Sequence, residues 1–328
     1  MRNRLALIAT VALLLGAAGC AGDSSPRYDA TTPPKAIGQG TEQGAAPAGT
    51  QPAPAGEQTC NPRASLRPSG ALPQPGRMPA GTLMADIQKR GRLILGTSQD
   101  TLLFSSRNPF SGKIEGFDVD MGRLIAKAIF GSPDKLQITV IGYDQRVNSV
   151  LQGKVDVVAD TMTANCDRWK DVNFSSIYYE AGQKVLVSKD SPAKRLEDLG
   201  GKKICSAAGS TSYDNIGKVK SNPPPVAVSR ASFGDCLVAF QQNEVDAIST
   251  DDTILAGMAA QDPYAKVIGP RHTEEPYGMA LNRDHPEFTQ FVNAVLEQAR
   301  RDGIWKATYE KWLGRFGPAP QPPAAQYR

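Results

Sequence analysis

Two stretches of the chain follow the same pattern and decide its fold class. Leu151–Thr161 reads LQGKVDVVADT, and Phe240–Asp251 reads FQQNEVDAISTD. In each, the end of a helix leads through a Val-Asp turn into a short apolar strand that ends in polar residues. Open α/β sheets bind their ligands at the carboxyl ends of strands. The repeat therefore favours two α/β lobes that present polar strand ends to one cleft, although helix-turn-strand units look alike in any α/β protein.

The rest of the body alternates between strand and helix patterns. Apolar residues recur at helical spacing over 117–129 and over 286–301, and Pro286 suits the first turn of the second helix. Short apolar runs typical of strands occur at 93–96, 138–140, 155–159, 185–187, 203–205, 226–228 and 246–248. Strands that alternate with helices predict an α/β fold with mainly parallel sheets.

Composition excludes several classes of function. The chain has 328 residues, of which 40% are hydrophobic and 21% charged, so it can bury a core in one large or two modest domains. Its net charge of +4 is too small for its length to indicate binding to nucleic acid or to an anionic membrane surface. Two His and five Cys without close spacing leave little material for a metal site, and we expect no cofactor.

The first twenty residues are typical of a bacterial export signal. A short basic start at 1–4 precedes the apolar run Leu5–Leu15. The residues Ala-Ala-Gly-Cys that end at Cys20 resemble a lipobox, although that motif prefers Leu where Ala17 stands. The resemblance implies a signal peptide over 1–19 and a lipid on Cys20 that anchors the chain to the outer face of the cell membrane. The alternative is an ordinary secretion signal. No later apolar run approaches the length that crosses a membrane.

A linker and a tail flank the expected folded body. Residues 20–82 are rich in Pro, Gly, Ala, Ser, Thr and Gln and contain few large apolar side chains. Such a segment cannot offset its ordering entropy by burial, so we expect a disordered, lipid-anchored linker. A shorter Pro-rich tail follows at 317–328. The folded body is therefore expected over about 83–316.

The segment Gly116–Met121 reads GFDVDM and continues into the helical pattern through Ile125 and Ile129. It closely resembles the signature of bacterial extracellular solute-binding proteins for polar amino acids, which feed ABC importers. Further matching features follow in the same order: 148–156, Thr161-x-Thr163 with Arg168 five residues on, 172–175 before Tyr178-Tyr179, 209–211, Asp251-Asp252, 275–280 and 305–313.

The resemblance covers 83–313 and implies the type II periplasmic-binding-protein fold. In that fold two lobes, each a sheet flanked by helices, are joined by two crossing strands and close around one amino acid. We expect lobe 1 at 83–181 with 277–316, and lobe 2 at 182–276. The chain is expected to be a monomer, and its relatives to include glutamate-, aspartate- and glutamine-binding lipoproteins.

An amino-acid zwitterion needs a cation for its α-carboxylate. Arg168 offers a planar bidentate fork, and the resemblance places it against that carboxylate with help from the backbone N–H groups of Thr163 and Thr211. The turn at 209–212, which includes Ser210, follows a predicted strand and should open a helix, so its free N–H groups also suit an anion. Without the motif, Arg168 reads as one more surface charge.

The ligand's ammonium needs an acceptor. The resemblance assigns this role to Asp251, together with the carbonyl of Thr161 and the hydroxyl of Thr163. Asp160 precedes Thr161 at the same strand end and is included among the candidate ligand-binding residues. The alternative for Asp251 is a cap for the helix that follows it.

Residues 143–147 bear on the ligand's side chain. They resemble glutamate- and aspartate-binding members, in which an Arg at the position of Arg146 meets the side-chain carboxylate. Because a desolvated Arg without a partner is costly, Arg146 favours an acidic ligand; alternatively, it caps or pairs on its own helix. Tyr143 is expected on the cleft wall or in the core, and Ser98 as a further polar contact. We rank glutamate and aspartate first, asparagine and glutamine next, and basic amino acids last.

Four cysteines remain besides Cys20, and three pairings are open. Cys205 lies on a predicted strand of lobe 2, and Cys236 lies on the helix that precedes its partner strand. This favours Cys205–Cys236 and leaves Cys60 to pair with Cys166. Disulfides persist outside the cytoplasm; the alternative is that buried cysteines stay free and simply pack.

Together these features predict a lipid-anchored receptor that captures an amino acid and passes it to the permease of an ABC importer. A sensor lipoprotein that signals through a membrane partner needs the same cleft, so the sequence does not separate the two. An enzyme of this fold is a third alternative. We expect no catalytic residue, because His272 and His285 are the only histidines and neither lies in an acid–base motif.

Overall fold

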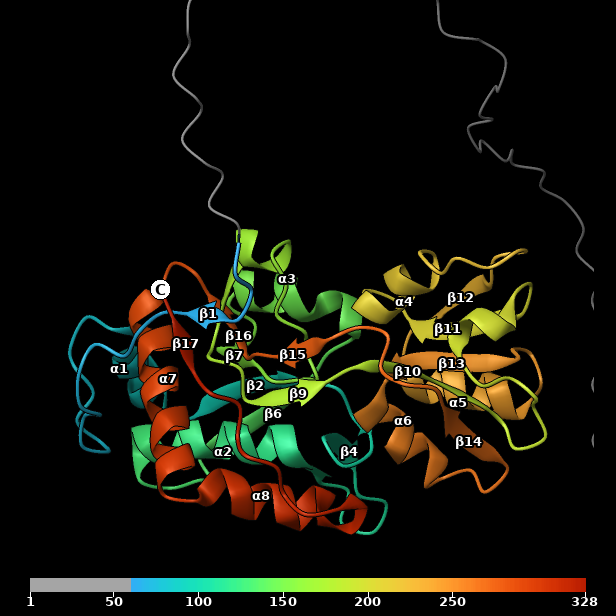
Figure 1. The fold of residues 1–328 in the computed structure, drawn as a ribbon. Coiled ribbons are helices and arrows are strands. Elements are labelled where there is room, and N and C mark those ends of the chain that lie inside the picture. The colour runs from blue at the N-terminus through green and yellow to red at the C-terminus, as the bar shows by residue number, and fades with distance from the viewer. Residues whose placement is uncertain (1–59) are drawn as a thin grey trace, which may run out of the picture. The chain divides into compact units, whose positions relative to one another are not determined.

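The computed structural model describes residues 60–328. The expected signal peptide over 1–19, the lipidation at Cys20 and the linker as far as residue 59 lie outside the described residues. None of the helices between residues 60 and 328 is long and apolar enough to cross a membrane. The described part consists of two lobes, each with its own five-stranded sheet (Figure 1).

Lobe 1 is built on a sheet with the strand order β6-β2-β7-β16-β8. Its strands are β2 (Leu93–Thr97), β6 (Leu136–Val140), β7 (Val157–Val158), β8 (Val172–Phe174) and β16 (Ala280–Asn282). Its helices are α1 (Leu83–Arg90), α2 (Phe117–Phe130), α3 (Arg146–Leu151), α7 (Pro286–Arg301) and α8 (Ile304–Leu313). β2 runs parallel to β6 and β7, whereas β16 runs antiparallel to β7 and β8.

Lobe 2 repeats this plan with the strand order β12-β11-β13-β10-β14. Its strands are β10 (Gln183–Ser188), β11 (Lys203–Ala207), β12 (Val226–Arg230), β13 (Ala247–Asp251) and β14 (Ala265–Ile268). Its helices are α4 (Thr211–Ile216), α5 (Phe233–Gln241) and α6 (Asp252–Ala259). β11 is parallel to β12 and β13, whereas β10 is antiparallel to β13 and β14.

Both sheets are therefore mixed, which corrects the prediction of mainly parallel sheets. The antiparallel strands β10 and β16 each follow directly from a strand that crosses between the lobes. Parallel neighbours need a long crossover connection, whereas antiparallel neighbours do not. The apolar runs at 185–187 and 280–281 have the composition of any buried strand. Their composition therefore does not show whether the strand runs parallel or antiparallel to its neighbours.

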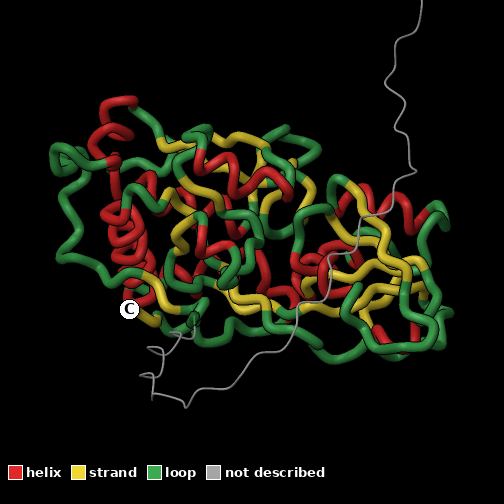
Figure 2. Tube along the Cα trace, turned by 90° about the horizontal axis from the view of Figure 1, so that it is seen from above, coloured by secondary structure: helices red, strands yellow, loops and turns green. Residues whose placement is uncertain are grey.

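The lobes are joined by two crossing strands. These are β9 (Tyr179–Ala181) and β15 (Glu275–Tyr277), which pair antiparallel with Tyr277 opposite Tyr179. Figure 2 shows the two lobes side by side with the chain passing between them. The hinge tyrosines are held in an aromatic cluster, because the Tyr179 ring stacks on Tyr277 with 5.7 Å between centroids and meets Phe104 edge-on at 5.1 Å.

A small antiparallel sheet precedes α2. It consists of β3 (Asp100–Thr101), β4 (Ser105–Arg107) and β5 (Ile114–Glu115). Gly116 connects β5 to α2 with φ 145°, and a Cβ at this position would lie 2.1 Å from the carbonyl oxygen of Phe104. Only glycine fits so close an approach. The helices α2 and α7 coincide with the two predicted at 117–129 and 286–301.

The prediction of a disordered linker is wrong for residues 60–82. β1 (Ala64–Ser65) pairs in parallel with β17 (Gln326–Tyr327), so the linker end and the tail form one two-stranded sheet. Asn293 of α7 donates hydrogen bonds to the Ser65 hydroxyl at 2.7 Å and to the Leu66 carbonyl at 2.6 Å. Backbone pairing, side-chain hydrogen bonds and a disulfide hold this segment, so it needs few large apolar side chains.

Two disulfides cross-link the described residues, Cys60–Cys166 and Cys205–Cys236. These are the pairs favoured by the sequence. Cys205 and Cys236 are fully buried in the core of lobe 2. Cys60, in contrast, is exposed and ties the first described residue to the segment of lobe 1 that also carries Arg168.

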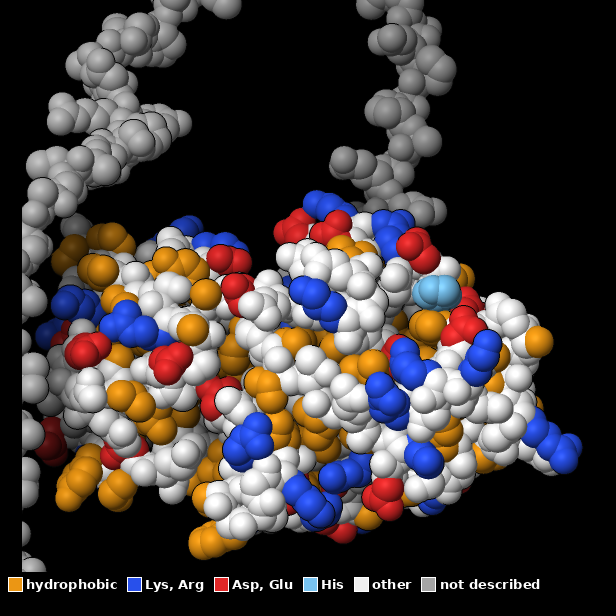
Figure 3. All heavy atoms as spheres, turned by 180° about the vertical axis from the view of Figure 1, so that it is seen from behind, with side chains coloured by type: hydrophobic (Ala, Val, Ile, Leu, Met, Phe, Trp, Pro, Cys, Tyr) orange, Lys and Arg blue, Asp and Glu red, His pale blue; other side chains and the backbone are white. Residues whose placement is uncertain are grey.

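The surface carries charges of both signs. On the face seen in Figure 3, basic and acidic side chains are interspersed over both lobes. Among residues 60–328, no group of three or more His, Cys, Asp or Glu side chains is arranged to hold a metal ion.

Candidate functional site

A small cavity lies between the two lobes and has about 220 Å³ of empty space, including space open to solvent. Lobe 1 contributes Tyr143, Arg146, Thr161, Thr163 and Arg168 to its lining, and lobe 2 contributes Ser210, Thr211, Ser212, Phe233, Thr250, Asp251 and Ile254. Most of the predicted ligand-binding residues are thus brought together. Asp160 and Ser98 lie behind the lining, Ser212 was included only as part of the turn at 209–212, and Phe233, Thr250 and Ile254 were not predicted.

The two repeated strand ends form opposite walls of this cavity. Thr161 follows β7 in lobe 1, and Asp251 is the last residue of β13 in lobe 2. Thr161 has φ 41°, a backbone conformation that is held by a hydrogen bond from its N–H to the Asp118 carboxylate at 2.7 Å. The hydroxyl oxygen of Thr161 is buried without a partner. It is therefore available to a ligand.

Asp118, the acidic residue at the third position of the GFDVDM segment, supports the cavity wall through its buried carboxylate. It lies in the first turn of α2, is completely buried, and also accepts a hydrogen bond from the Tyr178 hydroxyl at 2.7 Å. Burial raises the pKa of Asp118 to about 7. This carboxylate supports the backbone at Thr161 from behind, a role that was not predicted from the sequence.

Arg168 lies where both lobes meet. Its guanidinium donates to the carbonyl of Thr163 in lobe 1 at 2.8 Å and to the carbonyl of Gly209 in lobe 2 at 3.0 Å. It forms none of the ion pairs found among the described residues. Burial, together with the positive charge of Arg146 nearby, lowers the pKa of Arg168 to about 9. The cavity thus holds a cation without a bound carboxylate.

Arg146 is a second guanidinium in the same wall and is 3% exposed. It donates to the carbonyls of Tyr143 at 2.9 Å, Asp160 at 3.0 Å and Gly209 at 3.2 Å. The side chain lies over the Tyr143 ring, 5.0 Å from its centroid. It forms no ion pair with a carboxylate of the described residues. Three of its five N–H groups are thus used, and two remain.

Asp251 is the acceptor on the opposite wall. One carboxylate oxygen accepts from the Tyr277 hydroxyl at 2.6 Å, and the other is buried without a partner. Burial and, next, the negative charge of Glu275 raise the pKa of Asp251 well above its ordinary value. Although Asp251 stands at the N-cap position of α6, its side chain makes no capping hydrogen bond. The capping alternative is therefore not realised.

The hydroxyls of Thr163 and Thr211 turn towards the hinge. Both donate to one carboxylate oxygen of Glu275, at 2.6 and 2.8 Å, and Thr273 donates to the other oxygen at 2.7 Å. Glu275 lies on β15 and is 2% exposed. In this arrangement the Thr163 hydroxyl faces a hinge carboxylate, whereas the sequence predicted that it meets the ligand's ammonium. Thr211 opens α4 after the Ser210 cap.

Ser98, Asp160 and Tyr143 form a hydrogen-bonded layer behind the cavity. The Ser98 N–H donates to one Asp160 oxygen at 2.9 Å, and the Ser98 hydroxyl bonds to Ser105 at 2.8 Å. The Tyr143 hydroxyl bonds to Thr101, and its ring meets Phe233 of lobe 2 edge-on at 4.8 Å. The Ser98 hydroxyl is thus already satisfied within lobe 1, and it is the backbone N–H of Ser98 that holds the Asp160 carboxylate.

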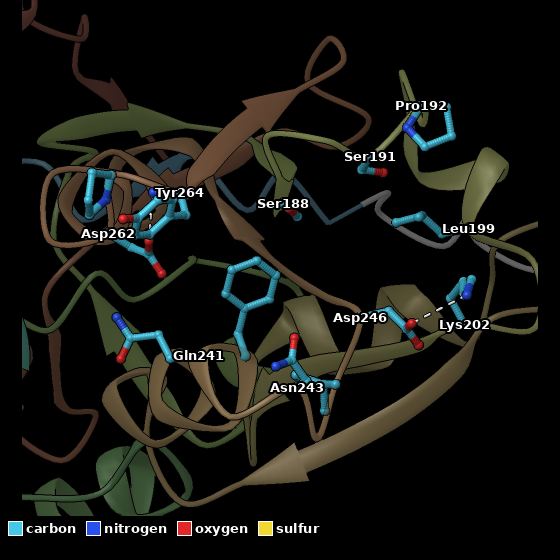
Figure 4. Close-up of a pocket in the computed structure, with 13 residues that line it drawn as sticks. Ser188, Ser191, Pro192, Leu199, Lys202, Gln241, Asn243, Asp246, Asp262 and Tyr264 are labelled. Atoms are coloured by element: carbon cyan, nitrogen blue, oxygen red, sulfur yellow. Dashed lines mark hydrogen bonds and ion pairs between the residues drawn. The ribbon is translucent and has the colours of Figure 1, made fainter.

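A wider hollow opens on lobe 2 alone (Figure 4). It has a volume of about 1370 Å³, including space open to solvent, and none of the predicted ligand-binding residues lines it. Its charged side chains already have partners, because Lys202 pairs with Asp246 and Asp262 accepts from the N–H of Tyr264. This hollow lacks the two guanidiniums and the unpaired carboxylate oxygen that distinguish the small cavity.

Comparison with known proteins agrees with this geometry. The family model of bacterial extracellular solute-binding proteins, family 3, matches residues 93–315. The chain is 36% identical over 232 residues to the ABC transporter glutamine-binding protein GlnH of Bacillus subtilis, an alignment that covers 70% of this chain and 84% of that protein. It is 33% identical over 245 residues to the glutamate-binding protein GluB of Corynebacterium efficiens, covering 71% and 82% of the two chains.

Solved structures of related proteins share the fold. An ancestral arginine-binding protein bound to glutamine superposes with a TM-score of 0.64 at 33% identity, covering 69% of this chain and 99% of the other. The protein has the type II periplasmic-binding-protein fold with two mixed-sheet lobes. Members of this family bind amino acids and deliver them to ABC permeases. The chain belongs to the bacterial extracellular solute-binding proteins, family 3.

Proposed function

We propose that this protein captures glutamate or glutamine, and more weakly aspartate or asparagine, for an ABC importer. One observation carries the proposal: a single small cavity is lined by the buried guanidinium of Arg146 and the partly buried guanidinium of Arg168, neither with a carboxylate partner, and by a buried carboxylate oxygen of Asp251 that has no donor. An amino-acid zwitterion supplies both missing partners at once. Buried charges and polar groups are stable only when they are paired.

The α-carboxylate of the ligand is assigned to Arg168. Its guanidinium is held within lobe 1 by the carbonyl of Thr163, and the carbonyl of Gly209 in lobe 2 adds a second hydrogen bond where the lobes meet. The α-ammonium is assigned to Asp251, whose free oxygen faces the same cavity as the unpartnered hydroxyl of Thr161. One zwitterion would thus pair with the cation of Arg168 on the lobe 1 wall and with the carboxylate of Asp251 on the lobe 2 wall.

The side chain of the ligand is assigned to Arg146. Its two remaining N–H groups suit either a carboxylate or an amide oxygen. The positive charge favours the carboxylate, so acidic ligands rank above amides of equal length, and basic amino acids rank last. The related GlnH and GluB proteins are named for glutamine and glutamate. That supports ligands with the longer side chain.

Delivery requires that the protein stays near its permease outside the cytoplasm. We propose that the residues before 20 act as an export signal and that a lipid on Cys20 anchors the chain to the outer face of the membrane. The lipobox-like residues ending at Cys20 support this assignment. Metabolic labelling with a radioactive fatty acid should mark the wild-type chain and leave Cys20→Ala unlabelled. Equal labelling of both chains would refute the anchor at Cys20.

Calorimetric titration tests the ligand assignment. After removal of copurified ligand, the chain is titrated with glutamate, glutamine, aspartate, asparagine and arginine. We expect binding of the first four, with glutamate tightest, and no binding of arginine. Arg146→Ala should weaken glutamate far more than glutamine. Equal losses for both ligands would mean that Arg146 does not distinguish the acid from the amide, and absence of binding by every amino acid would refute the proposed function.

A further inference from the structure

The two lobes also touch outside the ligand cavity. The hairpin β3–β4 of lobe 1 lies against α5 and α6 of lobe 2 along a groove that both lobes line. At this contact a carboxylate oxygen of Asp100 accepts a hydrogen bond from the backbone N–H of Gly234 at 2.6 Å. Asp100 does not line the ligand cavity. It is therefore a contact between lobes rather than a contact with ligand.

The Asp100 carboxylate lies at the N-terminus of α5, where backbone N–H groups lack partners within the helix. Ser232 caps α5 through the N–H of Asp235, and the Asp235 carboxylate returns to the Ser232 N–H. The N–H of Gly234, the second residue of the helix, takes its partner from the other lobe instead. An anion at a helix N-terminus is favoured by the helix dipole and by charge-assisted hydrogen bonding. The bond exists only while the lobes are close.

Glycines on lobe 2 make the close approach possible. A Cβ added to each of three of them would crowd lobe 1: Gly234 at 3.0 Å from the Asp100 carboxylate, Gly257 at 2.9 Å from the Leu102 carbonyl oxygen, and Gly209 at 2.6 Å from the Asp144 Cα. At Gly257 and Gly209 the obstructing atoms belong to the backbone of lobe 1, so a side chain there would require the lobes to move apart. The lobe 2 surface is thus shaped to receive the β3–β4 hairpin and the residues around Asp144.

We propose that Asp100 is a latch: it stabilises the closed form through the N-terminus of α5 and so slows ligand release without touching the ligand. The inference rests on the proposed function, since closure over a bound amino acid is what the latch would prolong. A contact present only in the closed form shifts the closed–open equilibrium by its own free energy. Weakening it should raise the dissociation rate for every ligand by the same factor.

Two variants separate this role from a folding defect. Asp100→Asn keeps the shape of the side chain and removes its charge, and it should raise the Kd of glutamate and of glutamine by roughly three- to tenfold alike. Gly257→Ala adds the obstructing Cβ within α6, where alanine favours the helix more than glycine does. We therefore expect it to fold normally and to bind at least roughly tenfold more weakly. Asp134→Asn, at an exposed site, is the matched control.

The measurement combines stopped-flow ligand dissociation with energy transfer between dyes on lobe 1 and lobe 2, attached at the exposed positions Lys154 and Lys220. The expected result is faster dissociation and lower transfer for Asp100→Asn and Gly257→Ala, with Asp134→Asn like wild type. Wild-type rates and transfer in Asp100→Asn would overturn the latch while leaving the proposed function intact. If wild type binds neither glutamate nor glutamine, the proposed function fails, and the latch is then decided by the transfer alone.

Discussion

Replacing Arg168 with alanine is the sharpest test of the binding site. The guanidinium is partly buried and donates hydrogen bonds only to two neutral carbonyls, at 2.8 and 3.0 Å. Its removal leaves the ligand's carboxylate buried without a partner, which costs about 3–5 kcal/mol. Because each 1.4 kcal/mol is tenfold in Kd, the affinity should fall by at least roughly a hundredfold.

Thermal unfolding turns this loss into a clear signal. At a ligand concentration of 100 times the wild-type Kd, binding stabilises the folded state by about 2.7 kcal/mol. For a chain of this size that raises Tm by roughly 5–10 °C. If Arg168→Ala weakens binding about 150-fold, the same ligand concentration contributes only about 0.3 kcal/mol, or roughly 1 °C. The ligand-free variant should be no less stable than wild type, because burial disfavours the charge of Arg168.

The control is Arg92→Ala, which removes an exposed arginine whose side chain makes no hydrogen bond or ion pair among the described residues. This variant should keep the full ligand-induced rise in Tm. The reasoning would be refuted if Arg168→Ala also kept that rise while calorimetry gave a Kd within threefold of wild type. The α-carboxylate would then have to bind elsewhere.

Three further predictions concern protonation, cross-linking and the backbone. Because burial raises the pKa of Asp251 and a bound ammonium would lower it again, ligand binding should release a proton and tighten as pH rises towards the raised pKa; titrations in buffers of different ionisation enthalpy would show no proton release if this is wrong. Replacing Cys60 and Cys166 by serine opens a loop with a sequence separation of 106 and should lower the free energy of unfolding by about 3–5 kcal/mol in denaturant titrations; an unchanged midpoint would contradict it. Gly116→Ala should lower the free energy of unfolding by at least roughly 3 kcal/mol, because its Cβ would lie 2.1 Å from a carbonyl oxygen at a backbone φ of 145°. Wild-type stability of this variant would contradict the close approach of the backbone at Gly116.

The residues that carry charge at the site could be predicted only through the resemblance to the family, since Arg168 by itself looks like one more surface charge. Arg168 follows the first repeated segment and Asp251 ends the second, and the structure brings both to one cavity. The direction in which a side-chain hydroxyl points could not be predicted in this way. Thr163 bonds to Glu275, a residue more than a hundred positions away, so only the folded hinge determines where that hydroxyl points.

Other features escaped prediction for physical reasons. Phe233 and Ile254 complete the cavity wall from helices whose apolar residues look like ordinary core positions. Thr250 could have been predicted as a cavity residue, since it lies at the polar end of the second repeated segment. The order in residues 60–82 came from hydrogen bonds and a disulfide, which composition does not display. Strand direction in the mixed sheets depends on the connections and not on the apolar runs themselves.

Lobe 2 lies between the two crossing strands β9 and β15 in the sequence. Both ends of the described chain pair with each other at β1 and β17 of lobe 1, and the chain leaves and re-enters that lobe through β9 and β15 (Figure 1). Lobe 2 is therefore topologically an insertion. Exchanging it for the same lobe of a relative would keep Arg146 and Arg168 and replace Asp251, the proposed partner of the ligand's ammonium. A graft of this kind would divide the recognition of one small molecule between two proteins.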